Sequence, residues 1–335
     1  MMQLPGVAAY ASMFLTLALI SGIACLGLNL QWGQTGLFNA GIAGFIAIGA
    51  YVSALLTTAP VAGRLAGPGW PMAVGWLAAA AAAGTASALV GAATLRLRSD
   101  SLAIATFGSA VVVQLVIRNA QGLTGGVFGV GFIPRPFDGL ADRPLLFGCA
   151  NLALVATVSI LLFLALERMA RSPWGRVLRA IREDERAARA LGKSPERHRL
   201  QAFALGGALM GLAGALQAHM VGFIAPDNYE AAFTFQIWTM LIVGGSGNNG
   251  GAWVGAVLVS MLWSATGLAT SAWVGPADQA RAATLRIIVV GVLLAAVLVL
   301  RPRGLIGERL GVSRHLARAA QSRSRSSNNG PKNLR

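Results

Sequence analysis

Apolar residues in this chain form long continuous runs, and polar residues collect in the short stretches between them. Most runs reach the roughly 20 residues that a helix needs to cross about 30 Å of hydrocarbon. The pattern predicts an all-α polytopic membrane protein with about 8–10 transmembrane helices. The nine runs cover residues 7–30, 37–57, 71–95, 101–117, 144–166, 200–222, 233–247, 251–273 and 282–300.

The run at 233–247 is shorter than the others, so we expect a tilted, broken or re-entrant segment there, or a helix that starts earlier, near Pro226. It ends in GGSGNNGGAWVGA (244–256), where Gly, Ser and Asn interrupt the apolar pattern. Glycine tolerates positive φ, so this stretch predicts a tight turn or unwound backbone. Two interpretations stay open: a break that lines a substrate path, and a plain cytoplasmic hairpin.

The distribution of basic residues along the chain predicts how these helices are oriented across the membrane. Of 27 Lys and Arg residues, ten lie between Arg168 and Arg199, nine lie from Arg301 to the end, and Arg96 and Arg98 share a short loop. Basic residues beside apolar runs mark the cytoplasmic side, and with nine spans the amino terminus would lie outside. The net charge of +15 therefore does not indicate a nucleic-acid partner, because the charges flank membrane segments.

We predict one transmembrane domain over residues 1–307, with a cytoplasmic loop at 168–199. The start, MMQLPGVAAY, lacks the basic region of a signal peptide, so the first run is expected to remain a membrane helix. Residues 308–335 are rich in Arg, Ser and Asn, which predicts a disordered basic tail that contacts anionic lipid headgroups.

The apolar runs carry almost no ionisable groups: they contain no Asp, Glu or Lys, and Arg286 is their only Arg. A carrier driven by protons or sodium would be expected to show such groups, so energy for transport would come from elsewhere. HExxH, GxSxG and Walker A motifs are absent, and no catalytic activity is predicted. For His219 we favour a hydrogen bond to a backbone carbonyl over a role as ligand or proton relay.

Small residues recur at four-residue spacing in two segments, which is typical of closely packed membrane helices. Gly36, Ala40 and Gly44, followed by Gly49, form the first stripe. The second stripe lies in LGGALMGLAGAL, at 205–216. Packing inside a helix bundle is sufficient to explain both.

The charged loop is predicted to contain one amphipathic helix that starts at Pro173 and ends at Gly192. Its apolar face is interrupted by Asp184 and is flanked by arginines and glutamates. Two interpretations compete: a solvated loop that only enforces orientation, and a helix that docks into a groove of a soluble partner. The expected apolar face comprises Val177, Ala180, Ile181, Ala188 and Leu191.

From Asn29 to Gly307 the sequence resembles the LivM-type permeases of branched-chain amino acid ABC importers. The most specific block is SPWGRVLRAIREDERAARALGKSPERHRLQAFALGGALMGLAGAL (172–216). Other similar blocks, in the same order as in the family, are GQTGLFNAGIAGFIAIGAY (33–51), LRLRSDSLAIATFG (95–108), GFIAPDNY (222–229), GGSGNNGG (244–251) and RPRGLIG (301–307).

The resemblance implies a permease domain of the bacterial inner (cytoplasmic) membrane that binds no cofactor of its own. Its expected partners are two cytoplasmic ABC ATPase subunits that bind ATP and Mg²⁺, a second, LivH-like permease, an extracytoplasmic substrate-binding protein, and membrane lipids. Leucine, isoleucine and valine are the default substrates, with urea, short amides or other amino acids as alternatives. An ATP-independent facilitator channel is the alternative from another class.

The resemblance also implies roles for single residues. A helix that couples to the ATPase would contain Arg182, Glu183, Asp184, Glu185, Ala188 and Gly192. Candidates for the translocation path or for helix packing are Asn39, Gly41, Gly44, Gly49, Gln114, Gly244, Gly245 and Gly247. The chain departs from the family pattern at Ile42, Val111, Gln114 and Phe128, which makes the pore more apolar than usual at positions near the substrate or the partner permease.

Overall fold

The computed structural model describes residues 4–59, 67–97, 99–273, 288, 291–292, 296 and 304–307. Regular structure in these residues is helical, apart from an isolated bridge between Val130 and Ile224. The helices are α1 (Leu4–Leu28), π-helix η1 (Asn29–Gly33), α2 (Ile42–Thr57), α3 (Met72–Thr94), α4 (Ser99–Asn119), α5 (Gln121–Thr124), α6 (Pro144–Arg171), α7 (Pro173–Glu183), α8 (Glu185–Ala190), α9 (Pro195–Val221), α10 (Ala231–Gly244) and α11 (Asn249–Trp273), with 3₁₀ turns η2 (Gly126–Phe128), η3 (Asp138–Leu140) and η4 (Pro226–Tyr229).

The prediction of an all-α polytopic membrane protein is confirmed. Six described helices are long and apolar enough to cross a membrane, and α2 and α10 are shorter apolar helices. The ninth run, 282–300, lies almost entirely outside the described residues, as does the tail at 308–335. The short run at 233–247 becomes η4 followed by α10, so its helix starts at Ala231.

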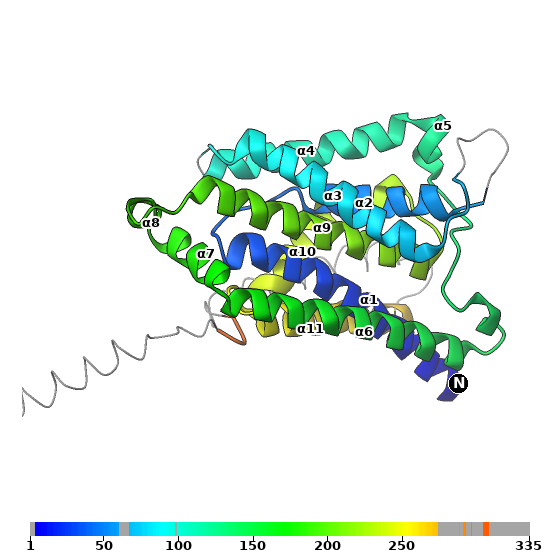
Figure 1. The fold of residues 1–335 in the computed structure, drawn as a ribbon. Coiled ribbons are helices and arrows are strands. Elements are labelled where there is room, and N and C mark those ends of the chain that lie inside the picture. Colours follow the sequence, from blue (N-terminus) through cyan, green and yellow to red (C-terminus); the bar gives the residue numbers. More distant parts are fainter. Residues whose placement is uncertain are drawn as a thin grey trace, which may run out of the picture.

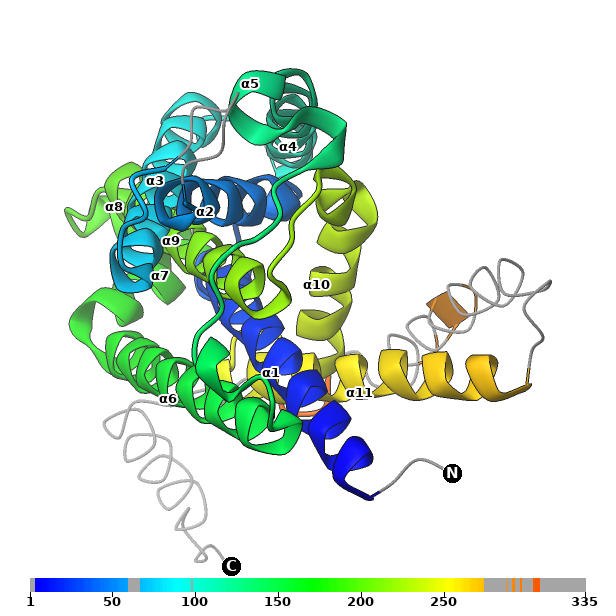
Figure 2. The same cartoon turned by 90° about the vertical axis from the view of Figure 1, so that its right-hand side faces the viewer.

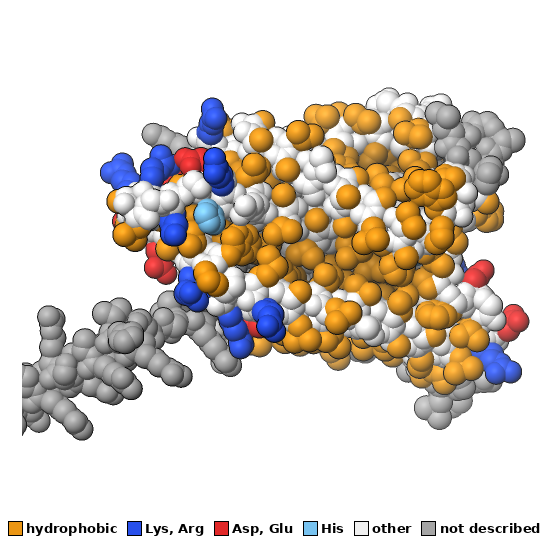
Figure 3. Space-filling view, in the orientation of Figure 1, with side chains coloured by type: hydrophobic (Ala, Val, Ile, Leu, Met, Phe, Trp, Pro, Cys, Tyr) orange, Lys and Arg blue, Asp and Glu red, His pale blue; other side chains and the backbone are white. Residues whose placement is uncertain are grey.

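The helices run roughly alongside one another, with α7 and α8 at one end of the bundle and α5 at the other (Figure 1). A broad apolar belt covers the side of the molecule, and Lys and Arg gather at the α7–α8 end (Figure 3). The beginning of α1 lies at the opposite end (Figure 1). We call the α7–α8 end the inner end and the opposite end the outer end, following the distribution of basic residues.

Helix α9 lies at the centre and packs against α1, α2 and α3 (Figure 2). Its glycines permit this approach: a Cβ added at Gly211 would lie 2.3 Å from the Ala83 Cβ, and one at Gly207 would lie 2.2 Å from the Ser87 Cβ. On α2, a Cβ at Gly49 would lie 2.0 Å from the Gly211 carbonyl oxygen. The predicted stripe on α9 is therefore a packing surface.

The first predicted stripe is wrong in part, because helix α2 begins only at Ile42. Residues 34–41 have no regular helical structure, and Gly36 has φ of +72°. The Asn39 carboxamide oxygen accepts a hydrogen bond from the Gly41 N–H at 2.7 Å, which offers the backbone an alternative to the helix. Of the stripe, only Gly44 and Gly49 lie on α2, and the membrane helix expected over 37–57 is shortened at its inner end.

Candidate functional site

The charged loop folds into two helices with a corner at Asp184. Helix α7 begins as predicted at Pro173, with Ser172 as its N-cap. Asp184 is extended, with φ of −149° and ψ of 103°, and its carboxylate accepts a hydrogen bond from the Ala187 N–H at 3.0 Å. The prediction of one continuous helix is wrong, because Asp184 ends α7 and caps α8.

The apolar residues of this corner turn toward the protein. Leu178, Ile181 and Ala188 are buried, whereas Leu191 is 79% exposed. The predicted apolar docking face is therefore divided, and the outward surface is mainly charged. An open hollow on this surface is lined by Glu183, Asp184, Glu185, Arg186, Arg189 and Ala190.

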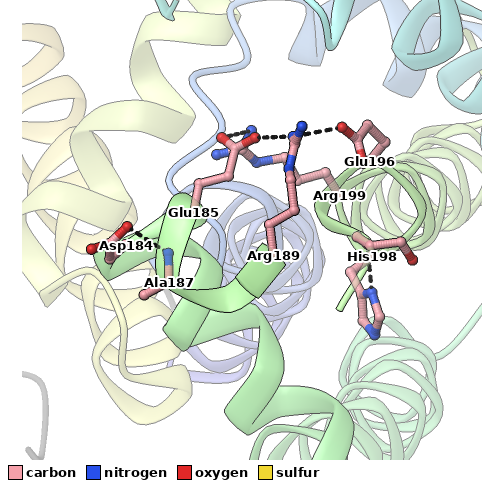
Figure 4. Close-up of polar contacts among 8 residues, drawn as sticks. Asp184, Glu185, Ala187, Arg189, Glu196, His198 and Arg199 are labelled. Carbon is pink, nitrogen blue, oxygen red and sulfur yellow. Dashed lines mark hydrogen bonds and ion pairs between the residues drawn. The ribbon is translucent and has the colours of Figure 1, made fainter. Parts of the chain in front are cut away.

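Ion pairs fasten α8 to the beginning of α9 (Figure 4). Glu185 accepts hydrogen bonds from Arg189 at 2.8 Å and from Arg199 at 2.7 Å, and Arg189 also contacts Glu196 at 2.7 Å. Exposed pairs of this kind contribute about 0–1 kcal/mol each, so their main effect is to fix the direction of α8. Glu185 thus supports the corner from within the chain, and Glu183 and Asp184 are exposed beside it.

Gly192 ends this helical unit, as predicted. Its φ is +74°, and its N–H donates to the Arg189 carbonyl at 3.0 Å, while the Lys193 N–H donates to the Ala188 carbonyl at 3.2 Å. A Cβ added at Gly192 would meet no atom within 4 Å. Glycine is therefore favoured here by backbone conformation rather than by space.

Arg182 connects α7 to the inner end of the first membrane helix. Its guanidinium donates a hydrogen bond to the Gly33 carbonyl at the end of η1. Its side chain also covers Gly36, where an added Cβ would lie 3.2 Å from the Arg182 Cγ. The corner thus contacts the start of the non-helical segment 34–41 directly.

A buried amide network continues from this point. The Asn29 Oδ1 accepts from the Gly247 N–H at 2.8 Å, and the Asn29 Nδ2 donates to the Asn249 Oδ1 at 2.9 Å. The Asn249 Nδ2 in turn donates to Glu167 at 3.1 Å. We name Asn29, Gly247, Asn249 and Glu167 the inner amide network; it joins η1, the turn before α11, and the end of α6. The pattern of apolar runs does not predict this network, although Asn and Gln residues cluster at 29–34.

The predicted glycines near residue 244 form a tight turn between α10 and α11. Gly245 and Gly247 have φ of +110° and +84°, and a Cβ at Gly244 would lie 2.0 Å from the Gly251 carbonyl oxygen. Residues 304–307 lie against this turn, with the Ile306 N–H donating to the Gly244 carbonyl at 3.0 Å. The turn contacts the inner end through Asn29, so of the two open interpretations the geometry favours the inner hairpin.

Other candidate path residues have packing partners. Asn39 is buried and donates from Nδ2 to the Gln31 Oε1 at 2.7 Å. A Cβ at Gly41 would lie 2.5 Å from the Thr106 carbonyl oxygen, and one at Gly44 would lie 2.7 Å from the Ala110 Cα. Gln114 donates to the Pro226 carbonyl at 3.3 Å. These contacts bring α2, α4 and the loop after α9 together. A role of these residues in a translocation path stays a prediction.

His219 is buried near the outer end of α9 and bridges two segments. Its Nδ1 lies 2.7 Å from the Pro134 carbonyl oxygen, and its Nε2 lies 2.9 Å from the Ser53 Oγ. Because a carbonyl only accepts, Nδ1 carries the proton and Nε2 accepts from the serine. The favoured interpretation, a histidine bonded to a backbone carbonyl, is confirmed. Among the described residues, no group of three or more His, Cys, Asp or Glu side chains is arranged to hold a metal.

Comparison with known proteins identifies the family. Residues 10–298 match the family described as "Branched-chain amino acid transport system / permease component". The chain is 34% identical to the high-affinity branched-chain amino acid transport system permease protein LivM of Escherichia coli (strain K12), over 73% of this chain and 60% of the relative. It is 28% identical to a probable LivM protein of Methanocaldococcus jannaschii, over 64% of this chain and 62% of the relative.

A weaker similarity links the chain to a second type of permease. It is 25% identical to the LivH permease protein of the same system in Escherichia coli (strain K12), over 73% of this chain and 81% of the relative. The chain thus spans about 60% of the length of the LivM relatives it matches first, and no solved structure matches it. The extent of the family match and the identity to LivM show that this multi-pass membrane protein belongs to the family of branched-chain amino acid transport permease components.

Proposed function

We propose that the chain is the membrane-spanning permease subunit of an ATP-binding cassette importer for branched-chain or related amino acids. It works in the inner membrane with two cytoplasmic ATPase subunits, a LivH-like permease and an extracytoplasmic substrate-binding protein. ATP and Mg²⁺ bind to the ATPases, and this chain contributes no catalytic group. Family membership and the printed roles of the LivM and LivH relatives support the proposal.

The α7–α8 corner carries the mechanistic part of this proposal. Its outward surface is charged and hollowed, which suits a soluble partner, and its inward contacts reach two membrane elements. Glu185 links it to α9 through Arg199, and Arg182 links it to η1 through Gly33. When the ATPases close, movement of the corner would therefore displace α9 and η1 together. We infer that this displacement opens and closes the path between the permease subunits.

The outer half of the bundle contains a pocket suited to an uncharged path. It has a volume of about 360 Å³ and lies among α1, α2, α9, α10 and α11, and none of the described residues in its lining is charged. Gln217 and Gln236 place amides among apolar side chains, and Tyr10 and Ser264 are hydrogen-bonded at 2.9 Å. Amides and hydroxyls can contact the polar groups of an amino acid while apolar walls contact its side chain. This composition supports an amino acid with an apolar side chain as the substrate.

Purification of the tagged full chain from its host membrane tests the assembly. We expect ATPase subunits and a second permease to copurify, and the complex to hydrolyse ATP faster when its binding protein carries leucine, isoleucine or valine. A facilitator channel would instead reconstitute amino-acid flux alone, without ATP. If only urea or short amides stimulate ATP hydrolysis, the proposed substrate is wrong, but the ATP-driven mechanism still holds.

The variant Glu185→Arg tests the role of the corner. It places a third cation beside Arg189 and Arg199, so we expect substrate-stimulated ATP hydrolysis to fall at least about tenfold with normal membrane insertion. Arg143→Gln, at the outer end, is the matched control and should leave the stimulation unchanged. Normal stimulation in Glu185→Arg would contradict a coupling role for α8.

A further inference from the structure

A second pocket lies near the outer end between α1, α6 and α9, and it shares Tyr10 and Leu17 with the first pocket. Its volume is about 400 Å³. Met13, Leu17, Phe147 and Met220 supply apolar walls, and Arg135 and Asn151 supply the polar groups discussed below. We call this space the outer crevice. It combines an apolar interior with one cation, which is the composition of a site for an amphipathic anion.

Asn151 places a polar amide in the wall of the outer crevice. The side chain is only 6% exposed, and among the described residues its buried Oδ1 has no hydrogen-bond partner. A buried amide oxygen without a partner is destabilising, so it is normally satisfied by protein, water or ligand. The amide carries both a donor and an acceptor, and rotation by 180° exchanges their positions, so the side chain can serve either kind of partner.

Arg135 contributes the positive charge of the outer crevice. It is exposed, and its Nη2 donates to the Val221 carbonyl at 2.9 Å, which holds the guanidinium over the end of α9. None of the ion pairs found among the described residues involves Arg135. Its other N–H groups form a planar fork, which matches the oxygens of a phosphate group.

The positions of the two polar groups match the layers of a lipid leaflet. Helix α6 begins at Pro144 in the outer loop region, and Asn151 lies about two turns, or roughly 10 Å, further along it. The headgroup layer of a bilayer is about 5–7 Å thick on each side. With the start of α6 at the membrane surface, Asn151 would lie just beneath the headgroup layer, near the depth of the ester carbonyls, and Arg135 would lie nearer the headgroups, on the loop before α6.

The opening of the crevice on the surface of the bundle also points to lipid. Tyr10 and Met13 in its lining are 44% and 51% exposed, so the space opens on the outside of the bundle. Among the described residues that line the crevice, Arg135 is the one charged side chain. A phospholipid brings a negative phosphate for this guanidinium and neutral esters for the amide of Asn151.

We propose that the outer crevice binds one phospholipid of the outer leaflet, with an anionic headgroup such as that of phosphatidylglycerol. Its phosphate pairs with Arg135, an ester carbonyl accepts a hydrogen bond from the Asn151 amide, and an acyl chain lies against Met13, Leu17 and Phe147. The lipid fills the space between α1 and α6 and holds the loop containing Arg135 against the end of α9.

Native mass spectrometry of the full chain, purified with the subunits that accompany it, tests the proposal. Phosphatidylglycerol, phosphatidylcholine and sn-glycerol 3-phosphate are titrated separately. We expect one phosphatidylglycerol to bind more tightly than phosphatidylcholine, and Arg135→Gln to weaken it about fivefold, the factor for losing one cation beside an anionic headgroup. Arg143→Gln, on the same loop region but outside the crevice, should leave the affinity unchanged.

Asn151→Leu provides an independent second variant. Leucine keeps a branched side chain but removes the unpartnered amide, so the lipid-free protein should melt at a higher temperature while phosphatidylglycerol binds about threefold more weakly. The proposal of a specific site would be wrong if both lipids bind equally tightly, or if Arg135→Gln and Arg143→Gln have equal effects. If glycerol 3-phosphate displaces phosphatidylglycerol at the same concentration, the ligand is not a lipid and the crevice is a simple anion site.

Discussion

Helices α9 and α4 are both long and apolar, but the glycines of α9 are closely packed against a neighbouring helix, whereas Gly108 of α4 has open space around it. In α9, a Cβ at Gly211 or Gly207 would collide with the neighbouring helix α3. In α4, a Cβ at Gly108 would meet no atom within 4 Å, and Ile104, on the same helix, is 74% exposed. The hydropathy of the two helices does not reveal this difference. Helix α9 is the packed centre of the bundle, and α4 offers much of its surface to its surroundings.

A second contrast is between the inner end, where buried polar groups are bonded to one another, and the exposed apolar surfaces of α3, α4 and α6. Asn29 and Asn249 are buried and bonded to each other across the bundle, and Arg182 attaches the α7–α8 corner to the same region. Helices α3, α4 and α6 expose large apolar side chains between their ends, such as Leu89, Ile104 and Leu161. The polar contacts of the corner with the rest of the bundle therefore reach α9 and η1 at the inner end. Substitutions should be costly there and mild on the exposed helices.

The largest effect is expected for Gly49→Leu. The added side chain would collide with the backbone of α9, because even a Cβ would lie 2.0 Å from the Gly211 carbonyl oxygen. Overpacking of this kind costs about 1–3 kcal/mol or more, and a backbone atom cannot rotate away. We expect a large loss of thermal stability in detergent. Gly108→Leu is the matched control and should lower the melting temperature little; equal effects would contradict the contrast between α9 and α4.

A smaller but clear effect is expected for Asn29→Ala. The change leaves the Gly247 N–H and the Asn249 Oδ1 without their partner in a buried site, at about 1–3 kcal/mol for an unsatisfied group. Denaturant titration of the purified protein measures the loss of unfolding free energy. Asn119→Ala is the control, because that side chain is exposed and bonds only within its own helix. If both variants lose equally little, the inner amide network does not stabilise the inner end.

Gly192→Ala should cost less, because only backbone conformation opposes it. No atom lies within 4 Å of the added Cβ, but φ stays at +74°, which costs about 1–2 kcal/mol for a residue other than glycine. We expect a modest stability loss and a weaker response of ATP hydrolysis to substrate, measured on the assembled complex. Gly192→Asn is the control, since asparagine tolerates the left-handed region. If Gly192→Asn loses as much stability and ATPase response as Gly192→Ala, a requirement for space, not backbone conformation, would explain the glycine.

The sequence predicts the membrane helices well where apolar runs are long, and it predicts poorly where a short polar side chain redirects the backbone. Residues 37–41 belong to a run predicted as a membrane helix, but the Asn39 side chain bonds to the Gly41 N–H and the helix starts at Ile42. Asp184 was recognised as an interruption of the apolar face, and it proved to cap a second helix. In both places a local side-chain hydrogen bond competes with the helix.

The candidate site is only partly visible in the sequence for a different reason. Family resemblance and charge select the loop that contains Arg182 and Glu185, and helix signals locate Pro173 and Gly192. The partners of these residues are distant: Glu185 reaches Arg199, and Arg182 reaches Gly33. No periodic pattern links such positions, because they meet only after the helices have packed.

The smallest effect, and one of opposite sign, is expected for Gly108→Ala. Glycine inside a helix is destabilising by roughly 0.5–1 kcal/mol relative to alanine, because the unfolded chain loses more freedom. The open space around Gly108 lets alanine remove that cost without a collision, so a melting temperature equal to or slightly above the original is expected. Gly211→Ala makes the same chemical change on α9 and should be destabilising, because its Cβ would lie 2.7 Å from the Ala79 carbonyl oxygen. If Gly108→Ala is instead the more damaging of the two, a partner must pack against this face of α4 in the assembled protein, and α4 would join α9 as a contact helix.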